Sequence, residues 1–156
     1  MPNRRIGSPA AAIALIVGLL VGGIPPAAIA QAPQLAPPPA GMARIWLLRQ
    51  FQPAGSLATP MIYLNGAPLA ASEPGTIFYH DAVPGRYNVS VDSCGTDVNQ
   101  ATVVELAPGN QAELEVQSLS TMAPPDCYDK ETFYVRPVQP RFLQLYLPQL
   151  RNIGAR

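Results

Sequence analysis

The stretch GTIFYHDAVPGRYNVSVD, residues 75–92, carries the clearest structural signal in the chain. Apolar and polar residues alternate over residues 87–91, the period of two expected for a strand with one buried face. Pro84 fixes φ at the first central position of a turn, and Gly85 can adopt the positive φ that a type II turn needs at the second. The stretch therefore predicts a β-hairpin that reverses at Pro84 and Gly85.

A second hairpin is predicted around Asn65 and Gly66, which suit the two positive-φ positions of a type I′ turn between residues 61–64 and 67–70. Further strand-like runs cover residues 43–50, 100–106, 111–119 and 131–138. Gly, Pro and Asn turns join these runs, and no long amphipathic helix interrupts them. The pattern predicts an all-β protein, a single antiparallel β-sandwich of about seven strands or a partly closed barrel.

Two of these runs differ in the expected burial of their faces. Residues 43–50, ARIWLLRQ, contain four consecutive apolar residues, so we expect a strand buried on both faces with Trp46 as a core anchor rather than a ligand platform. In residues 111–119 the acids Glu113 and Glu115 alternate with apolar residues, which predicts one solvated face. A cation site on this face is the less favoured interpretation.

Residues 1–30 show the parts of an export signal in order. Arg4 and Arg5 supply the positive start, residues 10–24 the apolar middle, and small residues the cleavage site that leaves Gln31 as the first mature residue. A retained anchor is the alternative, but the apolar run is shorter than the roughly 20 residues that span a bilayer. The sequence predicts a cleaved signal peptide and a periplasmic or secreted protein, with the Sec and twin-arginine routes both open.

The rest of the chain divides into three predicted parts. Residues 31–41 are rich in proline and alanine and predict an extended linker that acts as a spacer. Residues 42–140 form the predicted sandwich domain. Residues 141–156 form an apolar tail in which Pro148 interrupts any helix, so we expect either a strand or short helical turn packed on the domain or an exposed docking segment.

Charge argues against two classes of partner. The chain has 10 basic and 10 acidic residues, and removal of Arg4 and Arg5 leaves a net charge of −2 without any block of one sign. Nucleic acids and anionic membrane surfaces are therefore not expected partners.

Cys94 and Cys127 are the only cysteines, and both lie in the exported part, where the environment is oxidising. We expect a disulfide between them, which would stabilise the fold by roughly 3 to 4 kcal/mol through a loop of about 30 residues. A Cys-based metal or redox site is the alternative, but His80 is the sole histidine and the spacing is not C-x-x-C.

The run from A-R-I-W through M-I-Y-L-N-G-A-P-L to D-x-x-P-G-R-Y-x-V-x-V resembles a bacterial envelope domain of unknown function that is common in small lipoproteins. It is more distantly similar to PEGA and carboxypeptidase-regulatory-like sandwiches. The resemblance covers about residues 43–138, with residues 63–66 similar to a Y-V-D-G hairpin and residues 84–87 to a P-G-x-Y turn. It implies a β-sandwich in the envelope with no established catalytic residue. The chain departs from the family in lacking a lipobox cysteine.

No catalytic motif stands out in the sequence. His80, Asp81 and Ser90 supply the residue types of a hydrolase triad, but adjacent strand residues point to opposite faces and no G-x-S-x-G elbow is present. Asp81 is expected to cap the turn before Pro84. A carboxylate pair from Asp92 and Asp97 is also weaker than a solvated interpretation.

We therefore expect a non-enzymatic envelope protein that needs no metal or cofactor and acts as a structural or protein-interaction module, with another envelope protein as its partner. The alternative is a periplasmic carrier of a small apolar ligand or glycan. That function would require aromatic residues such as Phe78 and Tyr87 to line a cavity rather than fill a core.

Overall fold

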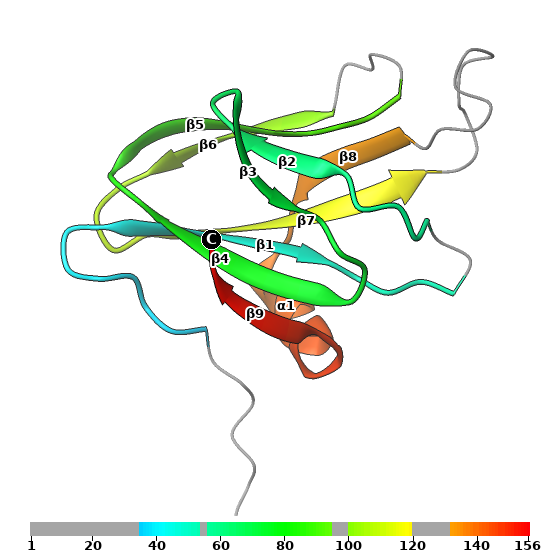
Figure 1. Ribbon diagram of the computed structural model, residues 1–156. Helices are drawn as coiled ribbons and strands as arrows, with labels where there is room; N and C mark the ends of the chain where they lie inside the picture. The colour runs from blue at the N-terminus through cyan, green and yellow to red at the C-terminus, as the bar shows by residue number, and fades with distance from the viewer. Residues whose placement is uncertain (1–34, 54–55, 95–99, 120–131) are drawn as a thin grey trace, which may run out of the picture. The chain divides into compact units, whose positions relative to one another are not determined.

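The computed structural model describes residues 35–53, 56–94, 100–119 and 132–156 (Figure 1). Within these ranges the chain forms nine strands, one α-helix and one 3₁₀ helix. The elements in chain order are β1 (Ala43–Arg49), β2 (Met61–Leu64), β3 (Ala67–Ala71), β4 (Thr76–Ala82), β5 (Gly85–Val91), β6 (Ala101–Leu106), β7 (Gln111–Leu119), β8 (Thr132–Pro137), α1 (Pro140–Tyr146), η2 (Leu147–Gln149) and β9 (Arg151–Ala155).

The strands form two sheets. The five-stranded sheet has the order β8-β7-β1-β4-β9; in it β1 runs antiparallel to β4 but parallel to β7, and β4 runs parallel to β9. The four-stranded sheet, β3-β2-β5-β6, is antiparallel throughout. The all-β prediction is confirmed. The antiparallel arrangement of about seven strands is wrong, because strands distant in sequence lie side by side in the same direction.

The hairpin expected over residues 75–92 is wrong, because β4 and β5 belong to different sheets. Only Val83 and Pro84 separate them, and these two residues carry the chain from one sheet to the other (Figure 1). Gly85 is not among the described residues with positive φ, so the type II turn is wrong as well. The predicted alternation in β5 does occur, but alternation identifies the buried face of a strand and not its neighbour.

The second expected hairpin is present and joins β2 to β3. Its two central residues, Asn65 and Gly66, have φ values of 51° and 81°, as the type I′ turn requires. The Asn65 side chain also accepts a hydrogen bond from the Asn88 backbone N–H at 2.8 Å. This bond connects the turn to β5, the next strand of the four-stranded sheet.

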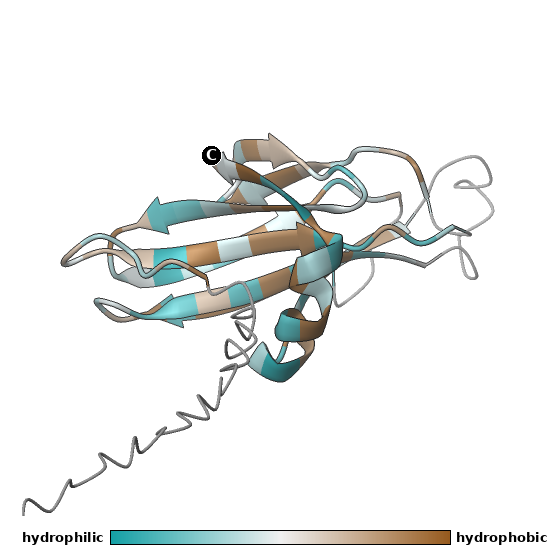
Figure 2. Ribbon diagram, turned by 90° about the horizontal axis from the view of Figure 1, so that it is seen from below, coloured by the Kyte–Doolittle hydropathy of each residue, from teal (hydrophilic) through white to brown (hydrophobic). Residues whose placement is uncertain are grey.

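The main core lies between the two sheets. In β1, Ala43, Ile45 and Leu47 point into this core, where residues of the opposite sheet such as Ile62 and Val89 meet them. The pattern appears in Figure 2 as alternating hydrophobic and hydrophilic segments along the strands. The other buried members of this core are Phe78, Val91, Leu106, Leu114, Val116, Phe133 and Val135.

A second apolar cluster covers the outer face of the five-stranded sheet. It consists of Trp46, Leu48, Ile77 and Leu143, all at most 2% exposed. Trp46 is therefore a core residue, as expected, and all seven residues of β1 are buried. The prediction that this strand is buried on both faces is confirmed.

The C-terminal tail supplies the cover for this outer face. Leu143 of α1 is buried there, Tyr146, Leu147 and Leu150 pack around it, and β9 then joins the edge of the sheet beside β4. Of the two conformations left open for residues 141–156, the packed one is present. The tail is part of the domain, so the boundary expected near residue 140 does not separate two structural units.

The solvated face expected for β7 is wrong. Glu115 is only 5% exposed, and its carboxylate accepts hydrogen bonds from Gln50 at 2.6 Å and Gln117 at 2.9 Å. Glu113 is half-buried and neighbours Trp46 in the β1–β7 register. Alternation correctly placed the acids on one face, but it could not show that this face is covered.

Cys94 lies just after β5, whereas Cys127 lies outside the described residues, so their disulfide stays a prediction. Two contacts bring the Cys94 region close to the start of β8. Ser93 Oγ accepts a hydrogen bond from the Phe133 N–H at 2.8 Å, and the Cys94 carbonyl accepts one from Thr132 Oγ1 at 3.4 Å. Cys127 precedes Thr132 by only five residues. Because an extended chain covers roughly 3.3 Å per residue, this separation is compatible with the expected disulfide to Cys94.

The packed tail gives a stability prediction with a control on the same helix. Leu143→Ala should lower the free energy of unfolding by about 2 to 5 kcal/mol, because it leaves a cavity over Trp46. Leu145→Ala, at a residue 64% exposed, should change it by less than about 0.5 kcal/mol. Urea denaturation of both variants measures the difference, and equal small effects would show that the tail is not part of the core.

Candidate functional site

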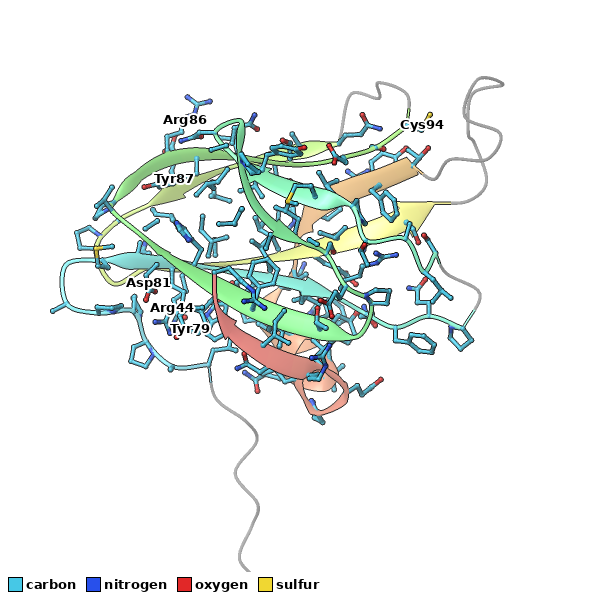
Figure 3. The ribbon with its side chains drawn as sticks, in the orientation of Figure 1. Arg44, Tyr79, Asp81, Arg86, Tyr87 and Cys94 are labelled. Atoms are coloured by element: carbon cyan, nitrogen blue, oxygen red, sulfur yellow. The ribbon has the colours of Figure 1, made fainter. Side chains whose placement is uncertain are left out.

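The guanidinium of Arg44 lies on the outer face of the five-stranded sheet, and the residue is only 4% exposed. Its Nε and Nη2 donate to the two carboxylate oxygens of Asp81, at 2.6 and 2.9 Å. The guanidinium carbon lies 3.9 Å from the centre of the Tyr79 ring and 5.5 Å from that of Trp46. Figure 3 shows Arg44, Tyr79 and Asp81 together near the start of β1.

The register of β1 and β4 brings these side chains together. Arg44 lies opposite Asp81, and Trp46 lies opposite Tyr79. Because alternate residues of a strand share a face, both cross-strand pairs lie on the same side of the sheet. The Trp46 and Tyr79 rings are tilted at 55° with centroids 5.0 Å apart. We call Arg44, Trp46 and Tyr79 the Arg44 face.

The end of the proline-rich linker lies on the Arg44 face. Arg44 Nη1 donates a 2.8 Å hydrogen bond to the Ala36 carbonyl, and Leu35 packs against the cluster that contains Trp46. At least this part of residues 31–41 is docked and is not a free spacer. The docked structure therefore begins before the expected domain start at Met42.

Hydrogen bonding shifts the ionisation of the pair in opposite directions. The bonds from Arg44 hold the pKa of the Asp81 carboxyl below its usual range, and the same bonds raise the pKa of Arg44. Both groups are thus charged at neutral pH. A bidentate pair of this kind fixes the plane of the guanidinium.

The triad residues are not brought together. Asp81 binds Arg44 on the outer face, so its expected role as a turn cap is wrong. His80 lies opposite Ile45, on the face that holds the main core, and its Nδ1 is 2.5 Å from the main-chain oxygen of Arg156. Ser90 lies on β5 in the other sheet. The described residues thus offer no nucleophile and base in contact at this position.

The described residues do not test the pair of acidic candidates, Asp92 and Asp97. Asp92 is linked to Tyr63 by a hydrogen bond that raises the tyrosine pKa, and Asp97 lies outside the described residues. Within the ranges described, no group of three or more His, Cys, Asp or Glu side chains could hold a metal ion. Among the described residues, neither helix has the length and hydrophobicity of a membrane-spanning segment.

Both aromatic residues expected for a carrier pack in or against the main core. Phe78 is 2% exposed within the main core, and Tyr87 packs against that core while its hydroxyl donates to the Val83 carbonyl at 2.6 Å. Hollows occur instead at the surface. One of about 160 Å³ is lined by Gln50, Phe51, Tyr146, Gln149 and Leu150, and one of about 430 Å³ by Gly85, Arg86, Glu105, Leu106, Ala107 and Asn110.

Sequence reasoning missed the Arg44 face, although one signal was available. Arg44 and Arg49 are the only charged residues of a strand that is otherwise apolar, and a charged residue in a strand buried on both faces needs a partner of opposite charge or other hydrogen-bond acceptors. Asp81 is the only acidic residue of β4. The partner could not be chosen without knowing that β1 pairs with β4.

Asp81→Asn should lower the free energy of unfolding at pH 7 by about 1 to 3 kcal/mol, because it leaves Arg44 buried without its carboxylate. The folded pKa of Asp81 is lowered, so its stabilising effect is present above the ordinary carboxyl value near 3.9 and is lost as the pH falls through the folded value. The difference in the free energy of unfolding between wild type and variant should therefore decrease at acidic pH.

Urea titrations of the two proteins at pH 7 and about pH 3 measure this difference. Glu73→Gln is the matched control, because the Glu73–Arg151 ion pair is largely exposed and its loss should cost less than about 1 kcal/mol. A difference that stays constant with pH would contradict the assignment of the ion pair.

Glu113→Gln should show the opposite pH dependence. Burial raises the pKa of Glu113, so the wild type loses stability relative to the variant as the pH rises from the ordinary carboxyl value near 4.3 through the folded value. The variant should therefore be the more stable protein at pH 7, as thermal denaturation would show. Glu105→Gln, at an exposed residue of β6, controls for the loss of one negative charge.

Comparison with protein-family models and with curated proteins finds no match to this chain. The resemblance to an envelope domain therefore stays a prediction, and the function has to be argued from the geometry of the described residues.

Proposed function

We propose that the chain is a non-enzymatic exported protein whose two-sheet domain acts as a protein-interaction module of the cell envelope. The observation that carries the proposal is the distribution of apolar side chains. The space between the sheets is filled by the main core, while large apolar residues remain exposed on α1 and on the loop after β1. A filled interior leaves the surface as the place to bind a partner.

The exposed residues concerned are Phe142 and Leu145 of α1, 41% and 64% exposed, and Phe51, 61% exposed. Phe51 also lines the 160 Å³ hollow together with Tyr146 from the same helix. Aromatic side chains, including Phe, are enriched in protein interfaces relative to the rest of the surface. A hollow of about 160 Å³ is smaller than the roughly 300 to 1,000 Å³ of typical ligand pockets and is therefore a weaker fit to a small-molecule carrier.

Strand addition at a sheet edge is a less suitable binding mode for this domain. Pro68 lies in edge strand β3 and offers no N–H. In edge strand β9 the Gly154 N–H is bound to the Asn152 side chain at 2.9 Å. At β8 the Val135 carbonyl accepts a hydrogen bond from Thr102 of β6 at 2.6 Å. These features protect edges against pairing with another chain.

An affinity pull-down tests the proposal, with the tagged mature protein, residues 31–156, as bait and its own envelope extract as the source of partners. Two double variants are compared with the wild type. Phe142→Ser with Leu145→Ser should reduce capture of the partner by about tenfold or more, the effect of losing interface hot spots. Val83→Ser with Val103→Ser, at exposed residues elsewhere, should leave it unchanged. Equal capture by all three proteins would contradict the proposal, and a co-purifying small molecule without a protein would favour the carrier.

A further inference from the structure

The Arg44 face holds a peptide segment without strand pairing. Residues 35–39 form neither helix nor strand, and Pro37, Pro38 and Pro39 have no N–H to donate. The three prolines therefore offer carbonyl oxygens and apolar surface only. Arg44 supplies the matching donor through Nη1, and the cluster that contains Trp46 supplies the apolar contact for Leu35.

The contacts select for chemical type more than for an exact sequence. The hydrogen bond from Arg44 reaches a main-chain carbonyl, which every residue carries. The ring of Tyr79, which is only partly buried, provides aromatic surface of the kind on which proline-rich segments commonly dock. The segment seated there carries no charged side chain, since residues 35–39 contain no acidic or basic residue.

The face does not depend on the linker for its geometry. Asp81 holds the guanidinium by two hydrogen bonds, and the Tyr79 ring lies against its plane. The linker adds one hydrogen bond from Arg44 and the packing of Leu35. If the linker leaves, Asp81 still holds the guanidinium, so Arg44 Nη1 stays in place beside the Tyr79 ring for another segment of the same kind.

We propose that the Arg44 face is a binding site for an extended, uncharged, proline-rich segment of another envelope protein, which exchanges with the chain's own linker. The occupant follows from the segment that already lies on the face. The proposal goes beyond the interaction surface of α1 and does not depend on it, because different residues form the two surfaces.

The test uses the mature chain, residues 31–156, and the same chain with Leu35→Asn, which weakens the docking of the linker. The probe is a synthetic peptide with the sequence of residues 31–42, QAPQLAPPPAGM, and the control peptide replaces Leu35 by Asn and the three consecutive prolines by Gly. Trp46 is the only tryptophan of the chain, so its fluorescence reports directly on the face.

Saturable binding of the probe to the Leu35→Asn chain is expected, with an apparent Kd at least about tenfold lower than for the wild type, because the competing linker is weakened. Adding Arg44→Lys should abolish this binding while circular dichroism shows that the domain is still folded. If Arg44→Lys unfolds the chain, the test is the difference in affinity of the Leu35→Asn chain for the probe and for the control peptide.

Two results would overturn the proposal. The first is equal response to probe and control peptide, or no saturable response in the Leu35→Asn chain. The second is a rise in the apparent mass of the chain with protein concentration, measured by analytical ultracentrifugation without added peptide. If Arg44→Lys abolishes this rise, the site binds the linker of a second copy. Loss of partner capture through α1 would leave this test unaffected.

Discussion

The structure depends on the burial of β1 on both faces. One face of this strand supplies the centre of the core between the sheets, and the other carries Trp46 and Leu48, which water would otherwise reach. Burying two such side chains stabilises the fold by roughly 1.5 to 3 kcal/mol each. The sheets alone cannot supply the outer cover, so α1 and the linker residue Leu35 provide it. The segments at both ends of the described chain thus belong to the fold.

Burial of the outer face also explains why an arginine in this strand needs several partners. Removing a guanidinium from water is costly unless its donors are satisfied and its charge is paired. Asp81 accepts two of the hydrogen bonds, Ala36 accepts a third, and the Tyr79 ring covers the plane. Arg49, at the other end of β1, is satisfied differently, because its guanidinium donates to the main-chain carbonyls of Ser56, Ala58 and Ser72. Arg44 therefore forms an ion pair with a side chain, whereas Arg49 holds main-chain carbonyls of the loop that follows β1.

Sequence patterns predicted local features of this fold better than its topology. The Asn65-Gly66 turn, the alternation in β5 and the burial of β1 were predictable because each depends on neighbouring residues or on the period of a strand. The exchange between sheets after Ala82 was not predictable, because a hairpin and a crossing between sheets bury the same residues of β4 and β5. The parallel strands β7 and β9 depend on long-range pairing, about which periodicity carries no information.

The same limit applies to the candidate site. Asp81 was expected to serve the nearby turn, whereas its partner Arg44 lies 37 positions away. Glu113 and Glu115 were correctly placed on one face, but the cover over that face comes from other segments. A sequence pattern suggests partners for a polar side chain only among residues close to it in the chain. The tertiary structure determines its actual partner and whether solvent reaches it. Because Asp81 fixes the guanidinium by two hydrogen bonds, undocking the linker would free the Arg44 Nη1 donor while the ion pair stays assembled, which is the property that a peptide-binding surface requires.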